Sequence, residues 1–296
     1  ETSEQTNIGF DATLMGKLNV NFDYYVKNTK DWLIRVPVLA STGADFTYIN
    51  GGDVKNTGVE LALNYRNSLG KSFHYSVGVN GSYNKNTIGN IPTNDHILHG
   101  YTNVLYANSG EFYRATNGQP VGYFWGLKTA GVFQTEEEIT GYTSKDGKLI
   151  QPDAKPGDVR YVDMNGDGVI GNEDRTKIGD PNPDFIYGFN ISLDYKGFDF
   201  LVQASGVAGN QLVQSWRGPG GRGNYSTEIL DRWTGPGSSN RIPRVTEEGG
   251  NWGQFSDLYV HDGSYLRIST LTLGYDFAGL AKKDYLSKVR LYVSVL

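Results

Sequence analysis

Three pairs of segments alternate apolar residues with mostly polar or small ones, and this period of two is the feature that most constrains the fold. The pairs are residues 6–14 with 17–26, 59–65 with 73–83, and 185–195 with 198–204. In the third pair, for example, Phe185, Phe189 and Leu193 fall on one side and Asn190 and Asp194 on the other. Side chains at every second position of a strand share one face, so each pair is typical of an antiparallel hairpin. The sequence therefore predicts an all-β chain.

The connections between these segments differ sharply in length. Within the pairs they are tight, at Met15-Gly16, at residues 67–70 and at Lys196-Gly197. Between the pairs they are long and irregular, and the longest runs from about residue 84 to 183. Two further strands are expected at residues 265–275 and 289–296. If the strands run alternately up and down, the tight turns meet at one end of the sheet and the long loops at the other, as in outer-membrane barrels.

Two architectures fit these faces. In a soluble sandwich the apolar face would be the core, whereas in a membrane barrel it would face lipid, and periodicity does not separate them. Strand length favours the barrel, because residues 73–83 and 185–195 each span 11 residues. A tilted membrane crossing needs about 9–11, and an average soluble strand has roughly 5–6.

Composition excludes several classes of function. The net charge of -5 gives no basis for binding nucleic acid. The chain contains no cysteine, so it has no disulfide, thiolate metal site or cysteine nucleophile. No Gly-x-Ser-x-Gly elbow is present, and the strand pattern gives no reason to expect a glycosidase carboxylate pair, so we predict that the chain is not an enzyme. From its first and last residues we expect a piece of a longer protein.

Several motifs resemble the SusC/RagA family of TonB-dependent outer-membrane transporters of Bacteroidetes. They run in order over nearly the whole chain: Asp23-Tyr-Tyr-Val-Lys-Asn-Thr-Lys-Asp31, Gly52-Asp-Val-Lys-Asn-Thr-Gly-Val-Glu-Leu61, Gly157-Asp-Val-Arg-Tyr-Val-Asp-Met-Asn-Gly-Asp-Gly-Val-Ile170, Ile178-Gly-Asp-Pro-Asn-Pro-Asp-Phe-Ile-Tyr-Gly-Phe189, Tyr195-Lys-Gly-Phe-Asp-Phe200, Leu230-Asp-Arg-Trp-Thr-Gly235, Asn240-Arg-Ile-Pro-Arg244 and Asp262-Gly-Ser-Tyr-Leu-Arg267.

The resemblance implies that residues 1–296 are the C-terminal part of a 22-stranded, plugged transmembrane β-barrel, with short periplasmic turns and long extracellular loops. The plug and the TonB box would lie outside this chain. The implied function is import of oligosaccharides or peptides through the bacterial outer membrane. The cargo would be delivered by a SusD-like surface lipoprotein, and TonB would supply the energy. The alternative from another class is a secreted, β-rich, calcium-dependent carbohydrate-binding module.

One acidic stretch has the spacing of a calcium loop. Asp163, Asn165 and Asp167 supply side-chain oxygens at loop positions 1, 3 and 5, Val169 a backbone carbonyl at position 7, and Asp174 a carboxylate at position 12. A hard cation needs several oxygens from a sharply curved loop, but position 12 usually holds the longer Glu. The same residues are also good turn formers, whose side chains satisfy their own backbone. Both readings, a Ca²⁺ site and a self-bonded turn, stay open.

The tryptophans fall largely in the long loops. A sugar ring presents apolar C–H faces that stack on aromatic rings, which makes Trp216 and Trp233 candidates for substrate binding. Packing within the loops, contact with a lid protein and the interfacial aromatic girdle of a barrel are the competing explanations.

Overall fold

The computed structural model describes residues 1–106, 108–215, 226–246, 250–277 and 288–296. The chain folds into two compact units, which we treat separately. The wall unit comprises Glu1–Thr93, Pro183–Asn210 and Gly263–Leu296, and the loop unit comprises Asn94–Asn182 and Gln211–Asp262. No helix in the described ranges has the length and hydropathy needed to span a membrane.

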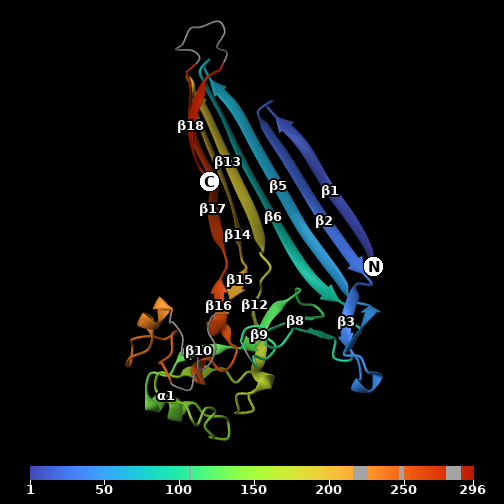
Figure 1. The fold of residues 1–296 in the computed structure, drawn as a ribbon, viewed down its shortest axis with the longest axis vertical. Coiled ribbons are helices and arrows are strands. Elements are labelled where there is room, and N and C mark those ends of the chain that lie inside the picture. Colours follow the sequence, from blue (N-terminus) through green and yellow to red (C-terminus); the bar gives the residue numbers. More distant parts are fainter. Residues whose placement is uncertain (107, 216–225, 247–249, 278–287) are drawn as a thin grey trace. The chain divides into compact units, whose positions relative to one another are not determined.

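The wall unit is built on one eight-stranded sheet in which every neighbouring pair is antiparallel (Figure 1). Its strands, in spatial order, are β1 (Thr2–Leu14), β2 (Leu18–Lys30), β5 (Asp53–Leu69), β6 (Phe73–Gly89), β13 (Phe185–Tyr195), β14 (Phe198–Ala208), β17 (Tyr265–Asp276) and β18 (Arg290–Val295). The order in the sheet is the order in the chain, so the sheet is a simple up-and-down meander, as the sequence predicts.

The register of the sheet aligns the apolar residues of successive strands in rows. One row joins Ala12, Val20, Leu63, Val79, Phe189, Ala204 and Ile268. The next residues along each strand form a row of the opposite kind, such as Asp11, Asn21, Ala62, Asn80, Gly188 and Ser205. We call the two sides the apolar face and the polar face. Because the side-chain period is two, a slip of one residue in any pair would exchange these faces.

Three tight turns join neighbouring strands at one end of the sheet. Met15 and Gly16 have φ of 54° and 66°, and Lys196 and Gly197 have 47° and 90°. Two successive residues with positive φ are typical of the type I′ turn, whose twist matches that of the flanking strands. The connection from β17 to β18 also leaves this end, and most of it lies outside the described residues.

A β-bulge in β17 shifts the register of this strand against β14 by one residue. Gln203 pairs with Thr270, but the next residue of β14, Ala204, pairs with Ile268. Ser269 is therefore the extra residue. If Ser269 were instead paired regularly with Ala204, Ile268 would lie on the polar face, so the bulge keeps Ile268 on the apolar face.

Two predictions of strand extent were wrong. β5 and β6 each have 17 residues and continue well past the apolar segments 59–65 and 73–83. The continuation is mostly polar, with pairs such as Asn56 with Asn86, and ladder hydrogen bonds stabilise it although the apolar alternation does not continue. The segment after β2, expected to be irregular, contains a hairpin of β3 (Leu33–Pro37) and β4 (Phe46–Asn50), with a 3₁₀ turn at Ala40–Thr42 between them.

The loop unit contains short strands and turns around its own core. Its strands are β7 (Ile97–His99), β8 (Tyr113–Thr116), β9 (Tyr123–Leu127), β10 (Thr129–Val132), β11 (Val159–Tyr161), β12 (Arg175–Gly179), β15 (Gln211–Val213) and β16 (Val260–Asp262). They form a sheet in the order β12-β9-β8-β7 and the pairs β10-β11 and β15-β16. The 3₁₀ turns are Asn172–Asp174, Thr227–Asp231, Gly250–Trp252 and Asp257–Tyr259.

Aromatic side chains dominate this core, and the same unit contains one short helix. Leu105, Phe112, Phe124, Phe255 and Tyr259 form one buried cluster. The helix α1 (Glu136–Gly141) begins after Thr135, whose hydroxyl caps it by accepting a hydrogen bond from the backbone N–H of Glu138. Packed aromatic residues of this kind make the long connections an ordered unit.

Candidate functional site

The polar face of the wall sheet carries amide, hydroxyl and carboxylate side chains that hydrogen-bond across strands. Thr13 donates to the side-chain oxygen of Asn19 at 2.9 Å, and Asn21 donates to Asp11. Towards the ends of β5 and β6, Asn86 donates to Asn56 at 2.9 Å. Cross-strand pairs of this type stabilise a sheet and leave further donors and acceptors open to a polar ligand.

A glycine makes room for the asparagines in the middle of this face. Gly78 lies between Asn64 on β5 and Asn190 on β13. A Cβ atom at Gly78 would lie 2.1 Å from the amide oxygen of Asn190 and 2.7 Å from that of Asn64. Both amides therefore lie flat against the backbone, and the surface stays shallow where a larger residue would raise it.

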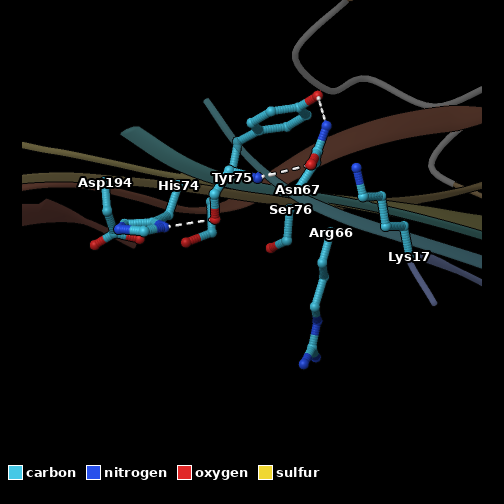
Figure 2. Close-up of a pocket in the computed structure, with 9 residues that line it drawn as sticks. Lys17, Arg66, Asn67, His74, Tyr75, Ser76 and Asp194 are labelled. Carbon is cyan, nitrogen blue, oxygen red and sulfur yellow. Dashed lines mark hydrogen bonds between the residues drawn. The ribbon is translucent and has the colours of Figure 1, made fainter. Parts of the chain in front are cut away.

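An open depression of about 490 Å³ lies at the turn end of the polar face (Figure 2). Its lining includes Lys17, Arg66, Ser68, His74 and Asp194. The backbone N–H of Arg66 donates to the carbonyl of Lys17 at 2.9 Å, and the Ser68 hydroxyl lies 2.7 Å from Nδ1 of His74. Two permanent cations and one carboxylate make this depression suited to charged or strongly polar groups.

In the acidic loop, residues 163–174, the side chains turn back onto the backbone. Asp163 accepts from the N–H groups of Gly166 and Gly168, at 2.7 and 2.9 Å. Asp167 accepts from Val169 at 2.9 Å, and the Asn165 oxygen accepts from the N–H of Asp167 at 2.9 Å. These contacts are the self-bonded turn that the sequence offers as the alternative to a calcium site.

The carboxylate expected at the end of the calcium loop is also used by the backbone. Asp174 is fully buried and accepts from Met164 at 2.8 Å and from Gly171 at 2.7 Å. Within the described ranges, no group of three or more acidic or histidine side chains is placed to hold a metal ion. The hydrogen bonds fit the self-bonded turn, and Ca²⁺ binding by Asp163, Asn165, Asp167, Val169 and Asp174 stays a prediction.

Of the two tryptophans predicted to bind substrate, the structure describes only Trp233. Trp216 lies outside the described residues. Trp233 is half-buried in the loop unit, where its indole N–H donates to the side-chain oxygen of Gln134 at 3.2 Å. A Cβ atom at Gly157 would lie 2.5 Å from the Trp233 ring, so the ring packs directly on that glycine. These contacts give Trp233 a packing role, and its role in substrate binding stays a prediction.

A polar brace that the sequence analysis missed holds the loop unit together. Arg244 donates to both oxygens of Asp158, at 2.7 and 3.1 Å, and Asn251 donates to the same carboxylate at 3.0 Å. The side-chain oxygen of Asn251 in turn accepts from the N–H of Val159 at 2.9 Å. A bidentate, partly buried pair is the stronger kind of ion pair. The available signal was that Asp158 and Arg244 both lie in stretches that resemble the transporter family.

A second charged cluster lies at the edge of the loop unit, around His99. Its two ring nitrogens lie 2.8 Å from carboxylate oxygens of Glu111 and Asp95. Burial acts to lower the pKa of His99, but the hydrogen bonds to the two carboxylates outweigh it, so the pKa is raised from its usual value. Among buried groups, desolvation raises the pKa of Tyr161 and keeps it a neutral donor.

Comparison with known families agrees with this architecture. The family model described as TonB dependent receptor-like, beta-barrel, matches residues 1–295. The chain belongs to this family. Its meander of antiparallel strands, with tight turns at one end and long connections at the other, is thus a segment of the wall of a TonB-dependent receptor barrel.

Among relatives of this receptor segment, TonB-dependent receptor P3 of Formosa agariphila is 33% identical over 99% of the chain and 29% of the relative. TonB-dependent receptor SusC of Bacteroides thetaiotaomicron is 26% identical over 100% of the chain and 28% of that protein. A solved structure of the RagAB peptide transporter covers 99% of the chain and 32% of its own, with a TM-score of 0.74 and 21% identity. The chain therefore spans under a third of the length of these proteins, and the SusC/RagA-type barrel portion predicted from the sequence is confirmed.

Proposed function

We propose that this chain forms part of the wall of an outer-membrane, TonB-dependent importer that carries oligosaccharides or peptides. The observation that carries the proposal is the two-faced sheet. On the described strands, the apolar face holds six rows without a charged residue, from the row of Phe73 to the row of Tyr83. Lipid accepts such a face, while the polar face suits a water-filled interior that conducts polar cargo.

The proposed partners, a SusD-like lipoprotein and TonB, follow from the assignment of the chain to an outer-membrane importer. Relatives named SusC and RagAB support delivery of the cargo by a SusD-like surface lipoprotein at the long loops. RagAB is a peptide transporter, which supports peptide as cargo, and the similarity to SusC leaves oligosaccharide as the other class. Coupling to TonB would use parts of the protein outside this chain. The chain would act by passage and binding, without an enzymatic step.

The alternative, a secreted calcium-dependent carbohydrate-binding module, has less support. In a soluble sandwich the apolar face would be packed against a second sheet. Here Leu61 and Val79, in the middle of that face, are 42% and 50% exposed within the described structure. The match to the barrel family over residues 1–295 also favours a membrane wall.

The assignment of the two faces is testable with spin labels on adjacent residues of β6. Ser76 and Val77 are neighbours on opposite faces, and this chain contains no cysteine, so a single introduced cysteine is its only labelling site. In the full-length protein in vesicles, the label at Val77→Cys should collide with lipid-soluble oxygen more than with a water-soluble nickel chelate. The label at Ser76→Cys should show the reverse. A label at Val77→Cys that neither quencher reaches would contradict the lipid-facing assignment and favour a packed sandwich.

Experiments that identify the cargo and the partner require the complete protein. Mass spectrometry of ligands that co-purify with it would distinguish oligosaccharide from peptide, and the same preparation would show whether a surface lipoprotein is retained. Loss of the gene should abolish growth on that cargo, and the complete gene should restore it. Growth unchanged by the deletion would count against import by this protein.

For the acidic loop, we propose Ca²⁺ as the only candidate cofactor. The carboxylates of Asp163 and Asp167 would have to release the N–H groups that they now accept from. Calorimetric titration of the purified protein with Ca²⁺, repeated on Asp163→Ala and Asp167→Ala, decides between the two readings. Absence of heat in the parent would establish the self-bonded turn.

A further inference from the structure

We propose that Lys55 and Lys85 form a binding site for the phosphate groups of an anionic lipid in the outer leaflet. The inference rests on the proposed function, because it requires the apolar face to be in the membrane. The two lysines have no part in cargo binding or in the chemistry of the polar face. They are on the lipid-facing side of the wall, just beyond the region that lipid tails cover.

The height of the charge-free band sets the position of the membrane. On β6 the band runs from Phe73 to Tyr83, which are ten residues apart. At about 3.4 Å per residue this is about 34 Å along the strand, or about 24 Å along the membrane normal for a tilt of about 45°. The apolar band of outer-membrane barrels is about 25 Å tall. Phe73 and Tyr83 therefore mark the two edges of the hydrocarbon region.

Lys85 and Lys55 come next on the same face, on the side of the long loops. Lys85 is two residues beyond Tyr83 on β6, and Lys55 is opposite Thr87, two residues further. By the same rise and tilt they lie about 5 Å and about 10 Å beyond the hydrocarbon edge. The headgroup layer is about 5–8 Å thick on each side. Both ammonium groups can reach it, because long lysine stems extend along the surface towards a favourable level.

Neither lysine is neutralised by the protein within the described structure. Both side chains are exposed, and no ion pair involves them. Lys30, on the same face, differs, since it pairs with Glu4 at 3.2 Å. Asp53 lies two residues from Lys55 on the same face, and the described structure shows no ion pair between them. The wall thus presents two cations outside ion pairs at the proposed level of the headgroups.

The relative position of the two lysines favours a shared anion. They are diagonal neighbours on adjacent strands, because Lys55 is opposite Thr87 and Lys85 is opposite Thr57. Diagonal neighbours on one face have Cα atoms about 7–8 Å apart, so the two ammonium groups repel unless an anion lies between them. A phosphate has several acceptor oxygens and matches this spacing, while zwitterionic headgroups lack the net charge.

The matched control is on the opposite face at the same level. Lys27 is opposite Asn56, so it lies between the rows of Thr57 and Lys55, but on the polar face. It is exposed and carries the same charge. Lys27→Gln thus removes an equal charge at equal height without touching the proposed site.

The test uses the full-length protein in nanodiscs of zwitterionic lipid doped with lipid A as the phosphate-bearing probe. Native mass spectrometry after transfer to detergent measures the retained lipid A. Each lysine near an anionic surface should contribute about five-fold, so Lys55→Gln/Lys85→Gln should reduce the preference for lipid A about 25-fold. Lys27→Gln should retain the parental preference. Heat-modifiable gel mobility would check that each variant folds.

Two outcomes would overturn the site: parental lipid A retention in the double variant, or an equal loss in Lys27→Gln. The spin labels at Ser76 and Val77 separate this failure from that of the proposed function. If Val77 faces lipid and the lysine variants have no effect, only the lipid site is wrong. If Val77 does not face lipid, both are wrong.

Discussion

A lysine introduced in the middle of the apolar face should be tolerated far less well than one placed a residue further along the strand. Val79 is on the apolar face of β6, and Asn80 is its neighbour on the polar face. Val79 is four residues from Tyr83, about 14 Å along the strand and about 10 Å along the membrane normal. The apolar band is about 24 Å tall by the same arithmetic, so Val79 is within about 2 Å of the midplane.

The magnitude follows from this depth. A lysine on the lipid face costs about 2–4 kcal/mol at the midplane and about 0–1 kcal/mol near the interface. We therefore expect Val79→Lys to lower the free energy of unfolding by about 3 kcal/mol and Tyr83→Lys by less than about 1 kcal/mol. Asn80→Lys should change it by no more than about 0.5 kcal/mol, because its ammonium group is in water on the polar face.

The assay is reversible denaturant unfolding of the full-length protein in lipid vesicles, followed by tryptophan fluorescence. Equal losses at Val79 and Asn80 would refute the assignment of the two faces. Equal losses at Val79 and Tyr83 would refute the depth gradient, and would indicate that the face is packed against protein and not in a bilayer. Only a large loss at Val79 with small losses at the other two positions agrees with the reasoning.

Three further predictions concern the loop unit. Gly157→Ala should destabilise the loop unit by at least about 1–2 kcal/mol, because Gly157 has φ of 92° and a Cβ atom there would lie 2.5 Å from the Trp233 ring. Limited proteolysis measures the loss. Gly141→Ala, which adds a methyl group in open space, is the control. The raised pKa of His99 means that its ion pairs stabilise the unit fully below pH of about 6.5 and are lost as the pH rises through the raised value. Rate-corrected hydrogen exchange of the surrounding strands should therefore be faster at high pH, and a pH-independent profile would contradict this. Asp174→Ala should leave backbone N–H groups in the acidic loop without their acceptor and cost about 1–3 kcal/mol, while Glu173→Ala, at its exposed neighbour, should be nearly neutral in thermal unfolding.

The sequence was sufficient for the strands that pair apolar rows. Phe185–Tyr195 has the same bounds in the structure as in the alternation, because every second residue lies on the apolar face there. The extensions of β5 and β6 are mostly polar, and their one apolar pair, Val54 with Ile88, lies on the opposite face from the apolar residues of the preceding segments, so the alternation does not continue. The hairpin of β3 and β4 has only five residues in each strand, too few for a periodic signal to separate it from a loop.

The site was harder to predict, because the same atoms serve two purposes. The spacing of Asp163, Asp167 and Asp174 places oxygens around a tight loop, and such oxygens either bind a cation or accept from nearby N–H groups. Spacing does not fix the direction in which a carboxylate points. The Asp158–Arg244 pair joins residues 86 positions apart, and such a contact depends on tertiary packing that a single sequence does not reveal.

The single extra residue in β17 changes the phase of side-chain alternation between the two halves of that strand. From Thr270 onward the odd-numbered residues Leu271, Leu273 and Tyr275 lie on the apolar face, and before Ser269 the even-numbered Leu266 and Ile268 do. If β17 paired without the bulge and kept Ser269, Ser269 would lie opposite Ala204, Leu266 and Ile268 would move to the polar face, and Arg267 would move to the apolar face. Deletion of Ser269 would place Ile268 opposite Ala204 without a bulge and leave the side chains on their present faces. The bulge therefore lets β17 carry one residue more than its partner strand without exchanging its faces, and further insertions should occur in the flanking loops.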